Sequence, residues 1–367
     1  MNHNRRSTTT SSNSVSQTVV RHARDVCEYG GPPPWANSPN LPTYIVEYLE
    51  WHVQMRCTNK RAHQDGVKYL LVKCASGGIA DRLANLPTYI LSAHKMNRVL
   101  LLQWNSPFPL EEFLAPHGIN WTVPEWLQIT NNLGHTSLSW NNKVVSHSEE
   151  TALLAEGLQL AFEIGKSNYD THILQQYNDS IYTYDRIYHD LFHSVFQLVP
   201  AIQSIVDHSM KQLSLTQGNY TSIHLRARHP NSNLPSDNTV DKSGGLEFSG
   251  KTKQKLVGMI QHAVDCAANL SPGLPIFFAS DSHHAVNYVL NEFSTKLGIP
   301  KLVGLVQNEE PLHFDTPDYK SKTPSDFYPT FVDFWLLGMS RCTAYGTGGY
   351  GRLAVRLSYI SSYSQSP

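Results

Sequence analysis

Short apolar runs that alternate with helical patterns constrain the fold of this chain more than any other feature of its sequence. Five such runs have the length of buried strands: Tyr69–Lys73, Val99–Trp104, Thr221–Leu225, Leu274–Ala279 and Lys301–Val306. Between them lie longer stretches with apolar residues at helical spacing, such as Tyr44–Met55 and Lys251–Ala268. Strands that alternate with helices form parallel sheets, so we expect an α/β fold.

The 367 residues, of which 40% are hydrophobic, favour two cores over one. A helical stretch broken near Pro200 separates two sets of strands and serves as a bridge. We therefore expect a disordered tail or stem over residues 1–40, an N-terminal α/β domain over 41–215 that includes the bridge, and a C-terminal α/β domain over 216–362. Both domains are expected to be Rossmann-like and doubly wound, and to face each other across a cleft. An apolar helix is expected over 148–166.

Charge and composition exclude several kinds of partner. The formal net charge of -1 gives no general attraction to nucleic acid or to anionic membranes, so any anion site must be local. No apolar stretch reaches the roughly 20 residues that span a bilayer, and the N-terminus lacks a signal-peptide core. We expect membrane association only if an anchor precedes this sequence. No metal is expected, because the sequence has no DxD motif and no histidine cage.

A glycine loop follows the first apolar run. Gly77 and Gly78 lie between this strand and a helical pattern, where a backbone without side chains lets a ligand approach closely. The first N–H groups of a following helix favour an anion. Asp81, in the same loop, either faces a ligand or caps that helix.

A second candidate segment ends the strand Thr221–Leu225. His224 and Arg226 are two residues apart, so they point to the same face of the sheet edge. Arginine offers a planar fork of donors that matches a phosphate, and Arg228 shares the parity. The alternative is an ordinary structural ion pair. Arg228 followed by His229 also raises the possibility of a histidine phosphatase, although Pro230 stands where that class has glycine.

The C-terminal half adds two acids and a further glycine loop. Asp281 lies just past an apolar strand, where open α/β sheets bind ligands, or else it caps the next helix. Asp333 sits in an apolar helix, so it needs a partner, either the N–H groups of a purine base or a nearby arginine. Thr347, Gly348 and Gly349 precede the last helix and form either a backbone cradle for phosphate or a plain turn.

Taken together and in order, these segments resemble the fucosyltransferase superfamily that includes α1,6-fucosyltransferases, protein O-fucosyltransferases and nodulation fucosyltransferases, which have the GT-B architecture. The resemblance rests on four segments: Gly77-Gly78…Asp81-Arg82-Leu83, His224-x-Arg226, Phe278-Ala279-Ser280-Asp281 and Thr347–Ala354. The chain departs from the family pattern at the second arginine of the H-x-R-R-x-D motif, which is Ala227, and at its aspartate, which is His229.

The resemblance implies transfer of fucose from GDP-fucose to a glycan or protein hydroxyl, with inversion, without a metal and within the Golgi lumen. It implies that Arg226 contacts the donor phosphate, that His224 lies beside the nucleotide and that Asp333 binds guanine. We expect Asp81 to be the general base. The donor-binding residues would be Gly77, Gly78, His224, Arg228, Asp281, Asp333, Thr347, Gly348 and Gly349. The missing arginine and aspartate leave open a catalytically silent nucleotide-sugar-binding protein. Four N-x-S/T sequons, at Asn120, Asn178, Asn219 and Asn269, favour the secretory pathway mildly.

Overall fold

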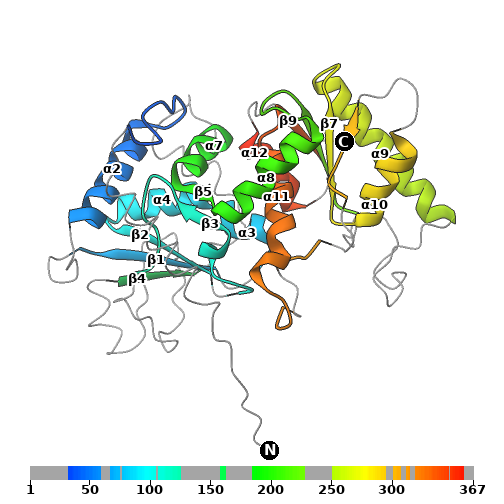
Figure 1. Ribbon diagram of the computed structural model, residues 1–367. Coiled ribbons are helices and arrows are strands. Elements are labelled where there is room, and N and C mark those ends of the chain that lie inside the picture. Colours follow the sequence, from blue (N-terminus) through cyan, green and yellow to red (C-terminus); the bar gives the residue numbers. More distant parts are fainter. Residues whose placement is uncertain are drawn as a thin grey trace, which may run out of the picture. The chain divides into compact units, whose positions relative to one another are not determined.

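Figure 1 shows the computed structural model of the chain. It describes residues 32–58, 67–74, 77–104, 106–124, 158–162, 184–227, 250–294, 301–306, 311–314, 319–346 and 348–358. Their contacts form two compact units. Unit 1 lies within Met1–Cys74, Thr88–Ile164 and His193–Val199, and unit 2 within Ala75–Pro87, Gly165–Phe192 and Pro200–Pro367. The units are interleaved along the chain, whereas the prediction placed a single boundary between residues 215 and 216.

Unit 1 contains a parallel sheet in the order β2-β1-β4. Its strands are β1 (Tyr69–Cys74), β2 (Val99–Trp104) and β4 (Leu158–Phe162). Strand β1 pairs with β2 from Tyr69 opposite Val99, and with β4 from Tyr69 opposite Leu158. The helix predicted over 148–166 is therefore wrong at β4. The pairing of Leu158–Phe162 with a buried strand overrides the helical pattern of the local sequence.

Helix α2 (Thr43–Thr58) covers the outer edge of β2, which no other strand pairs in the described part of the sheet. Its Tyr48 hydroxyl accepts a hydrogen bond from the Leu100 N–H at 3.1 Å. His52 Nε2 lies 3.0 Å from the Leu100 carbonyl oxygen and donates to it. Buried backbone groups need such partners, so two side chains of α2 replace the missing strand. Helix α4 (Leu86–Lys95) precedes β2.

A smaller antiparallel sheet completes unit 1. Strand β3 (Leu114–Pro116), which follows η1 (Leu110–Glu112), pairs with β5 (Phe196–Leu198). Residues 32–40, part of the predicted tail, form turns, and the Trp35 side chain is 3% exposed. Trp35 packs closely against Gly118. Trp35 therefore belongs to the core of unit 1, while residues 1–31 of the predicted tail lie outside the described residues.

Unit 2 contains a four-stranded parallel sheet in the order β8-β7-β6-β9. The strands are β6 (Thr221–Leu225), β7 (Ile276–Ser280), β8 (Leu302–Val303) and β9 (Cys342–Tyr345). Numbered along the chain, this order is 3-2-1-4, the order with which a Rossmann fold begins. Strands β7 and β8 are added on one side of β6, and β9 is added on its other side, so the strand order reverses between β6 and β9. Open α/β sheets bind ligands at the carboxyl ends of strands that flank such a reversal.

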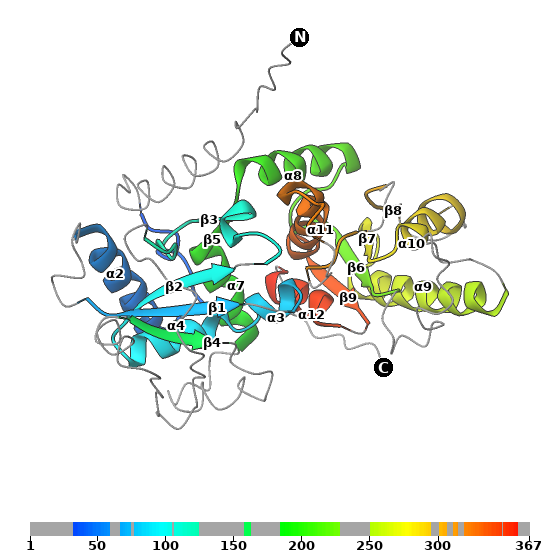
Figure 2. The same ribbon diagram turned by 90° about the horizontal axis from the view of Figure 1, so that it is seen from below.

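The two faces of this sheet are covered by different helices (Figures 1 and 2). Helices α9 (Gly250–Leu270) and α10 (His283–Tyr288), with η3 (Val289–Phe293), pack on one face. Ile223 and Leu225 of β6 belong to that apolar cluster. Helices α8 (Pro200–Leu213), α11 (Tyr328–Gly338, preceded by η4, Pro324–Phe327) and α12 (Gly349–Leu357) lie on the other side. Ser222 of β6 donates a hydrogen bond to the Leu337 carbonyl of α11, so side chains alternate between the faces as strand geometry requires.

Two more elements join unit 2 next to α12. Helix α3 (Ile79–Leu83) contacts α12, and helix α7 (Tyr184–Val195) begins in this unit. The helical pattern that follows Gly77 and Gly78 in the sequence thus forms two helices, α3 and α4. Arg356 of α12 donates from Nε to Asp185 of α7 over 2.8 Å, and its Nη1 lies 3.5 Å from the Ala84 carbonyl oxygen at the end of α3. One buried guanidinium therefore holds three helices together.

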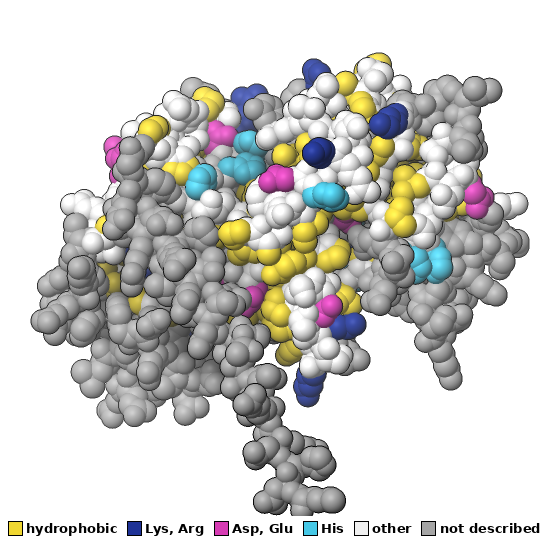
Figure 3. All heavy atoms as spheres, in the orientation of Figure 1, with side chains coloured by type: hydrophobic (Ala, Val, Ile, Leu, Met, Phe, Trp, Pro, Cys, Tyr) yellow, Lys and Arg dark blue, Asp and Glu magenta, His cyan; other side chains and the backbone are white. Residues whose placement is uncertain are grey.

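Surface charges are dispersed. On the face shown in Figure 3, the described lysine and arginine side chains are scattered singly and form no continuous basic patch. Among the residues that the structure describes, no helix combines the length and the apolar composition that crossing a membrane requires.

Candidate functional site

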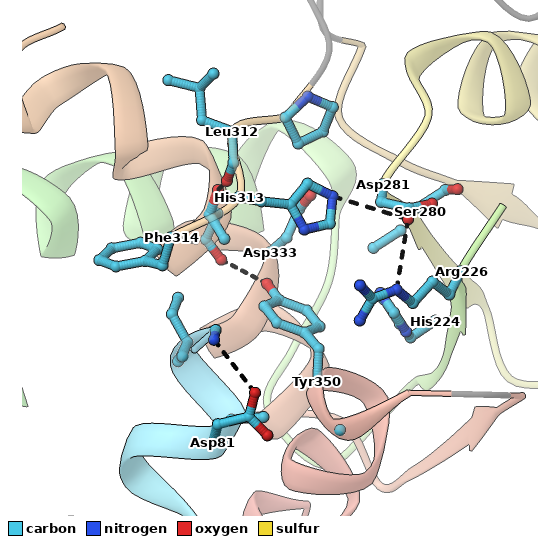
Figure 4. A pocket seen from close by; sticks show the side chains of 17 residues that line it. Asp81, His224, Arg226, Ser280, Asp281, Leu312, His313, Phe314, Asp333 and Tyr350 are labelled. Carbon is cyan, nitrogen blue, oxygen red and sulfur yellow. Dashed lines mark hydrogen bonds and ion pairs between the residues drawn. The ribbon is translucent and has the colours of Figure 1, made fainter. Parts of the chain in front are cut away.

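A pocket opens at the carboxyl ends of β6 and β7 and is closed by the start of α12 and by α3 (Figure 4). All of its lining residues belong to unit 2. It therefore lies where strand order 3-2-1-4 predicts a ligand. The lining residues are Gly78, Ile79, Ala80, Asp81, His224, Arg226, Ala279, Ser280, Asp281, Pro311, Leu312, His313, Phe314, Thr330, Asp333, Gly349 and Tyr350.

Arg226 directly follows β6 and lies between Asp281 and the glycine loop before α12 (Figure 4). Its Nε is 3.9 Å from Asp281 Oδ2, and its side chain is 26% exposed. A side chain on Gly348 would come within 2.9 Å of Arg226 Cδ, and Gly348 has a φ of +103° that favours glycine. Glycine at this position therefore gives the guanidinium room beside the pocket. The ion pair predicted as the alternative role of Arg226 is present, but it is long and leaves the guanidinium facing the pocket.

Asp281 is buried, and both of its carboxylate oxygens have partners in the protein. Oδ1 accepts a hydrogen bond from the Ala227 N–H at 2.6 Å. Oδ2 lies 3.9 Å from Arg226 Nε and 3.9 Å from His313 Nε2. The alternative role as a helix cap is wrong, because Ser282 is the N-cap of α10. Asp281 instead fixes the end of β6 and the position of Arg226.

His224 points to the same side of the sheet as Arg226, as the sequence predicted. Its ring lies 4.8 Å from that of Tyr350, centroid to centroid, and it packs against Gly351 of α12. The pKa of His224 is lowered to about 3, mainly by burial and to a smaller extent by the nearby Arg226 and His313. The imidazole is therefore neutral at physiological pH.

Asp333 and Tyr350 form the back of the pocket. Asp333 projects from α11, a helix whose other residues from Phe331 to Gly338 are buried and apolar. The Tyr350 hydroxyl donates to the Thr330 carbonyl oxygen. Burial raises the pKa of Tyr350. The negative charge of Asp333 raises this pKa further, because both side chains line the same pocket (Figure 4). A carboxylate and an aromatic ring at one end of a pocket suit a base that carries N–H donors.

The wall formed by α3 is built from the glycine loop after β1. Gly77 has a φ of +88°, and its carbonyl oxygen accepts a hydrogen bond from Arg82 Nε at 2.9 Å. The Gly78 N–H donates to Asp81 Oδ2 at 3.3 Å, so Asp81 also has the capping role given as its alternative. The Arg82 guanidinium is buried and lies 5.8 Å from the centroid of the Phe314 ring. The loop thus presents Gly78 and Asp81 to the pocket.

Seven residues predicted from the sequence line this one pocket: Gly78, Asp81, His224, Arg226, Asp281, Asp333 and Gly349. Gly77 and Gly348 adjoin it in the same two loops. Arg228, Thr347 and the phosphatase candidate His229 lie outside the described residues. The sequence reasoning missed His313 and Phe314, which lie in a short segment outside any helix or strand. It also missed Tyr350, although that residue stands inside the glycine motif.

Within the described ranges, no cluster of three or more histidine, cysteine, aspartate or glutamate side chains could hold a metal ion. The expectation of a metal-independent site remains a prediction.

Comparison with known proteins gives matches in structure only. The sequence matches no family model and no curated protein. The structure is similar to that of a mutant of Arabidopsis thaliana FUT1 in complex with GDP, with a TM-score of 0.53 and 11% identity, over 87% of this chain and 78% of that chain. Weaker similarity links it to NodZ alpha-1,6-fucosyltransferase soaked with GDP-fucose and to fucosyltransferase NodZ from Bradyrhizobium, each with a TM-score of 0.45 and 14% identity over 79% of this chain and 93% of the other.

The chain therefore has a mixed α/β fold with parallel sheets, like that of fucosyltransferases of the GT-B kind. This confirms the predicted α/β class with parallel sheets, while the arrangement of two facing domains across a cleft stays a prediction.

Proposed function

We propose that this protein is a glycosyltransferase that takes fucose from GDP-fucose and transfers it, with inversion, to a hydroxyl of a glycan or protein. The observation that carries the proposal is the position of Arg226. Its guanidinium lies beyond the carboxyl end of β6, where the strand order of the sheet reverses. It faces the pocket and adjoins the glycine loop at Gly348. The fold shared with FUT1, whose solved complex contains GDP, supports the choice of a guanosine nucleotide.

Catalysis would depend on the diphosphate leaving group. Negative charge grows on the bridging phosphate oxygen as the bond to the sugar breaks, and a fixed guanidinium stabilises that charge. Backbone N–H groups around Gly348 and Gly349 add donors that require no side chain. Asp333, with the neighbouring Tyr350 ring, would accept the N–H groups of guanine. His224 would contact the nucleotide as a neutral imidazole.

The acceptor hydroxyl must lose a proton as it attacks the sugar. Asp81 lines the pocket and is the acid we propose as the base. Its hydrogen bond with the Gly78 N–H orients the carboxylate. Donor and acceptor held in this geometry react without a metal ion in this proposal, because the guanidinium and backbone dipoles carry the leaving-group charge.

Calorimetric titration with GDP and with UDP tests the nucleotide assignment. We expect GDP to bind and UDP to bind at least tenfold more weakly, since uracil offers fewer N–H donors to Asp333. An Asp333→Asn variant should lose much of that preference while it keeps affinity for the diphosphate. Equal affinity of the parent protein for GDP and UDP contradicts the guanine assignment.

The silent-homologue alternative is favoured by one observation. Ala227, which occupies the place of the second family arginine, is buried in the core beside α9 and presents only its N–H to Asp281. A silent protein would bind GDP-fucose and never release fucose or transfer it. Incubation with labelled GDP-fucose and a pool of glycan acceptors separates the two, since the proposed enzyme releases GDP.

A secretory location forms part of the proposal. Cys57 is disulfide-bonded, and disulfides persist in oxidising compartments. Asn219 and Asn269 are exposed at the surface. Asn120 is 8% exposed, and its side chain accepts hydrogen bonds from Thr122, so this sequon is not an acceptor in the folded protein.

A further inference from the structure

The pocket carries little positive charge for a site that would bind a diphosphate. Among the described residues that line it, Arg226 is the cation with a fixed charge, whereas Asp81, Asp281 and Asp333 each contribute a carboxyl group. Asp281 lies within ion-pair distance of Arg226 and offsets part of its charge. A diphosphate with two or three negative charges needs a second cation in such surroundings.

Two histidines line the same pocket, and they differ in their surroundings. His224 is buried and neutral, because burial, together with the charges of Arg226 and His313, lowers its pKa to about 3. His313 lies in a segment outside the regular elements, and its side chain is 33% exposed. An imidazole changes its charge between about pH 5 and 8, so an accessible one can take up a proton when an anion arrives.

Building on the proposed function, we propose that His313 becomes the second cation of this site: it takes up a proton from solvent when the nucleoside diphosphate binds, and with Arg226 it clamps the phosphates. His313 Nε2 and Arg226 Nε both lie 3.9 Å from Asp281 Oδ2. Figure 4 shows the two side chains on either side of that carboxylate and both facing the pocket. Asp281 thus orients two cationic groups with a single oxygen.

The charged groups around His313 favour this role. Asp281 at the end of β7 and Asp333 on α11 are negative partners for an imidazolium, while Arg226 and the buried Arg82, which packs on neighbouring Phe314, oppose it. A bound diphosphate adds negative charge to that of Asp281 and Asp333 and therefore favours the protonated form of His313. At 3.9 Å the contact with Asp281 is longer than a direct hydrogen bond, and a phosphate oxygen in the pocket would offer His313 a closer acceptor.

Calorimetry of GDP binding at pH 7.5 tests this in two buffers of different ionisation enthalpy, because GDP itself is then largely ionised. The parent protein should take up about one proton, and His313→Gln should take up almost none and bind GDP about tenfold more weakly or worse. His313→Lys, which is charged without proton uptake, should restore most of the affinity. His208→Gln, at an exposed position of α8, is the matched control and should behave like the parent.

The outcomes separate this inference from the proposed function. GDP binding by the parent protein, with unchanged proton uptake and affinity in His313→Gln, overturns the role of His313 and leaves the proposed function standing. Absence of GDP binding by the parent overturns both. Thermal unfolding of each variant checks its fold. If His313→Gln does not fold, the proton count of His313→Lys decides, since uptake equal to that of the parent contradicts the proposal.

Discussion

Two arginine–aspartate pairs among the described residues of unit 2, Arg356–Asp185 and Arg226–Asp281, have opposite properties. Arg356 and Asp185 meet at 2.8 Å with side chains only 7% and 12% exposed. Arg226 and Asp281 lie 3.9 Å apart, and the Arg226 side chain is 26% exposed. In the first pair the two opposite charges form a direct contact that links helices α12 and α7. The second pair holds a guanidinium near a carboxylate but leaves it facing the pocket, so the same residue types link helices in one place and line a pocket in the other.

Removal of the buried pair should have the largest effect. Arg356→Ala removes the ion pair of the buried Asp185 carboxylate with Arg356 and should lower the free energy of unfolding by about 3–5 kcal/mol. Denaturant titration followed by circular dichroism measures the change. Arg352→Ala, at an exposed position of the same helix, is the control, and we expect it to change stability by about 0.5 kcal/mol or less. Equal loss of stability in Arg356→Ala and Arg352→Ala would contradict the stabilising role of the Arg356–Asp185 pair.

Removal of the pocket arginine should act on activity instead. Arg226→Ala should lower fucosyl transfer about a hundredfold or more, because the leaving diphosphate loses its main cation. The melting temperature should stay close to that of the parent, since the lost ion pair is long and partly exposed. Arg226→Lys keeps the charge without the planar fork and should recover only part of the rate. Fucosyl transfer at the parental rate by Arg226→Ala would contradict the proposal that Arg226 stabilises the leaving diphosphate.

Acid should lower the free energy of unfolding through His224, which lines the pocket. Its pKa is about 3 when folded and near 6.5 when unfolded, so the unfolded state binds the proton first. The stability contributed by neutral His224 is complete above about pH 6.5 and is lost progressively as the pH falls toward 3. Between pH 7 and pH 5 the loss should be about 2 kcal/mol. His224→Gln should show a correspondingly flatter dependence of stability on pH in urea titrations, and an unchanged slope would refute this role.

The smallest effect should come from the glycine beside Arg226. Gly348→Ala places a side chain at a φ of +103° and 2.9 Å from Arg226 Cδ, so it should cost about 1–2 kcal/mol of stability and displace the guanidinium. Gly273 also has a positive φ, +81°, but open space around it. Gly273→Ala should therefore match the loss of stability and keep GDP affinity. If both variants bind GDP equally well, contact with Gly348 does not position Arg226.

Much of the site could be predicted because it follows from strand geometry. Parallel strands end at one edge, so residues just after β6 and β7 had to meet, and Arg226 and Asp281 do. The two glycine loops were recognisable since each stands between a strand and a helix. His313 could not be found in this way, because its position depends on a loop with no periodic pattern. Strand β4 was mistaken for a helix, since its pairing with β1 is a contact that local sequence does not encode.

The chain supplies Gly78–Asp81 to the pocket from a short excursion, Ala75–Pro87, made between two strands of the other unit. A fragment cut at residue 216 would retain the four-stranded sheet and Arg226, yet would lack one wall of the pocket and the proposed base. No single cut in the chain therefore separates the residues of unit 2 from those of unit 1. Transfer of this pocket to another protein of the same fold would require Ala75–Pro87 to be transplanted together with the C-terminal part of unit 2.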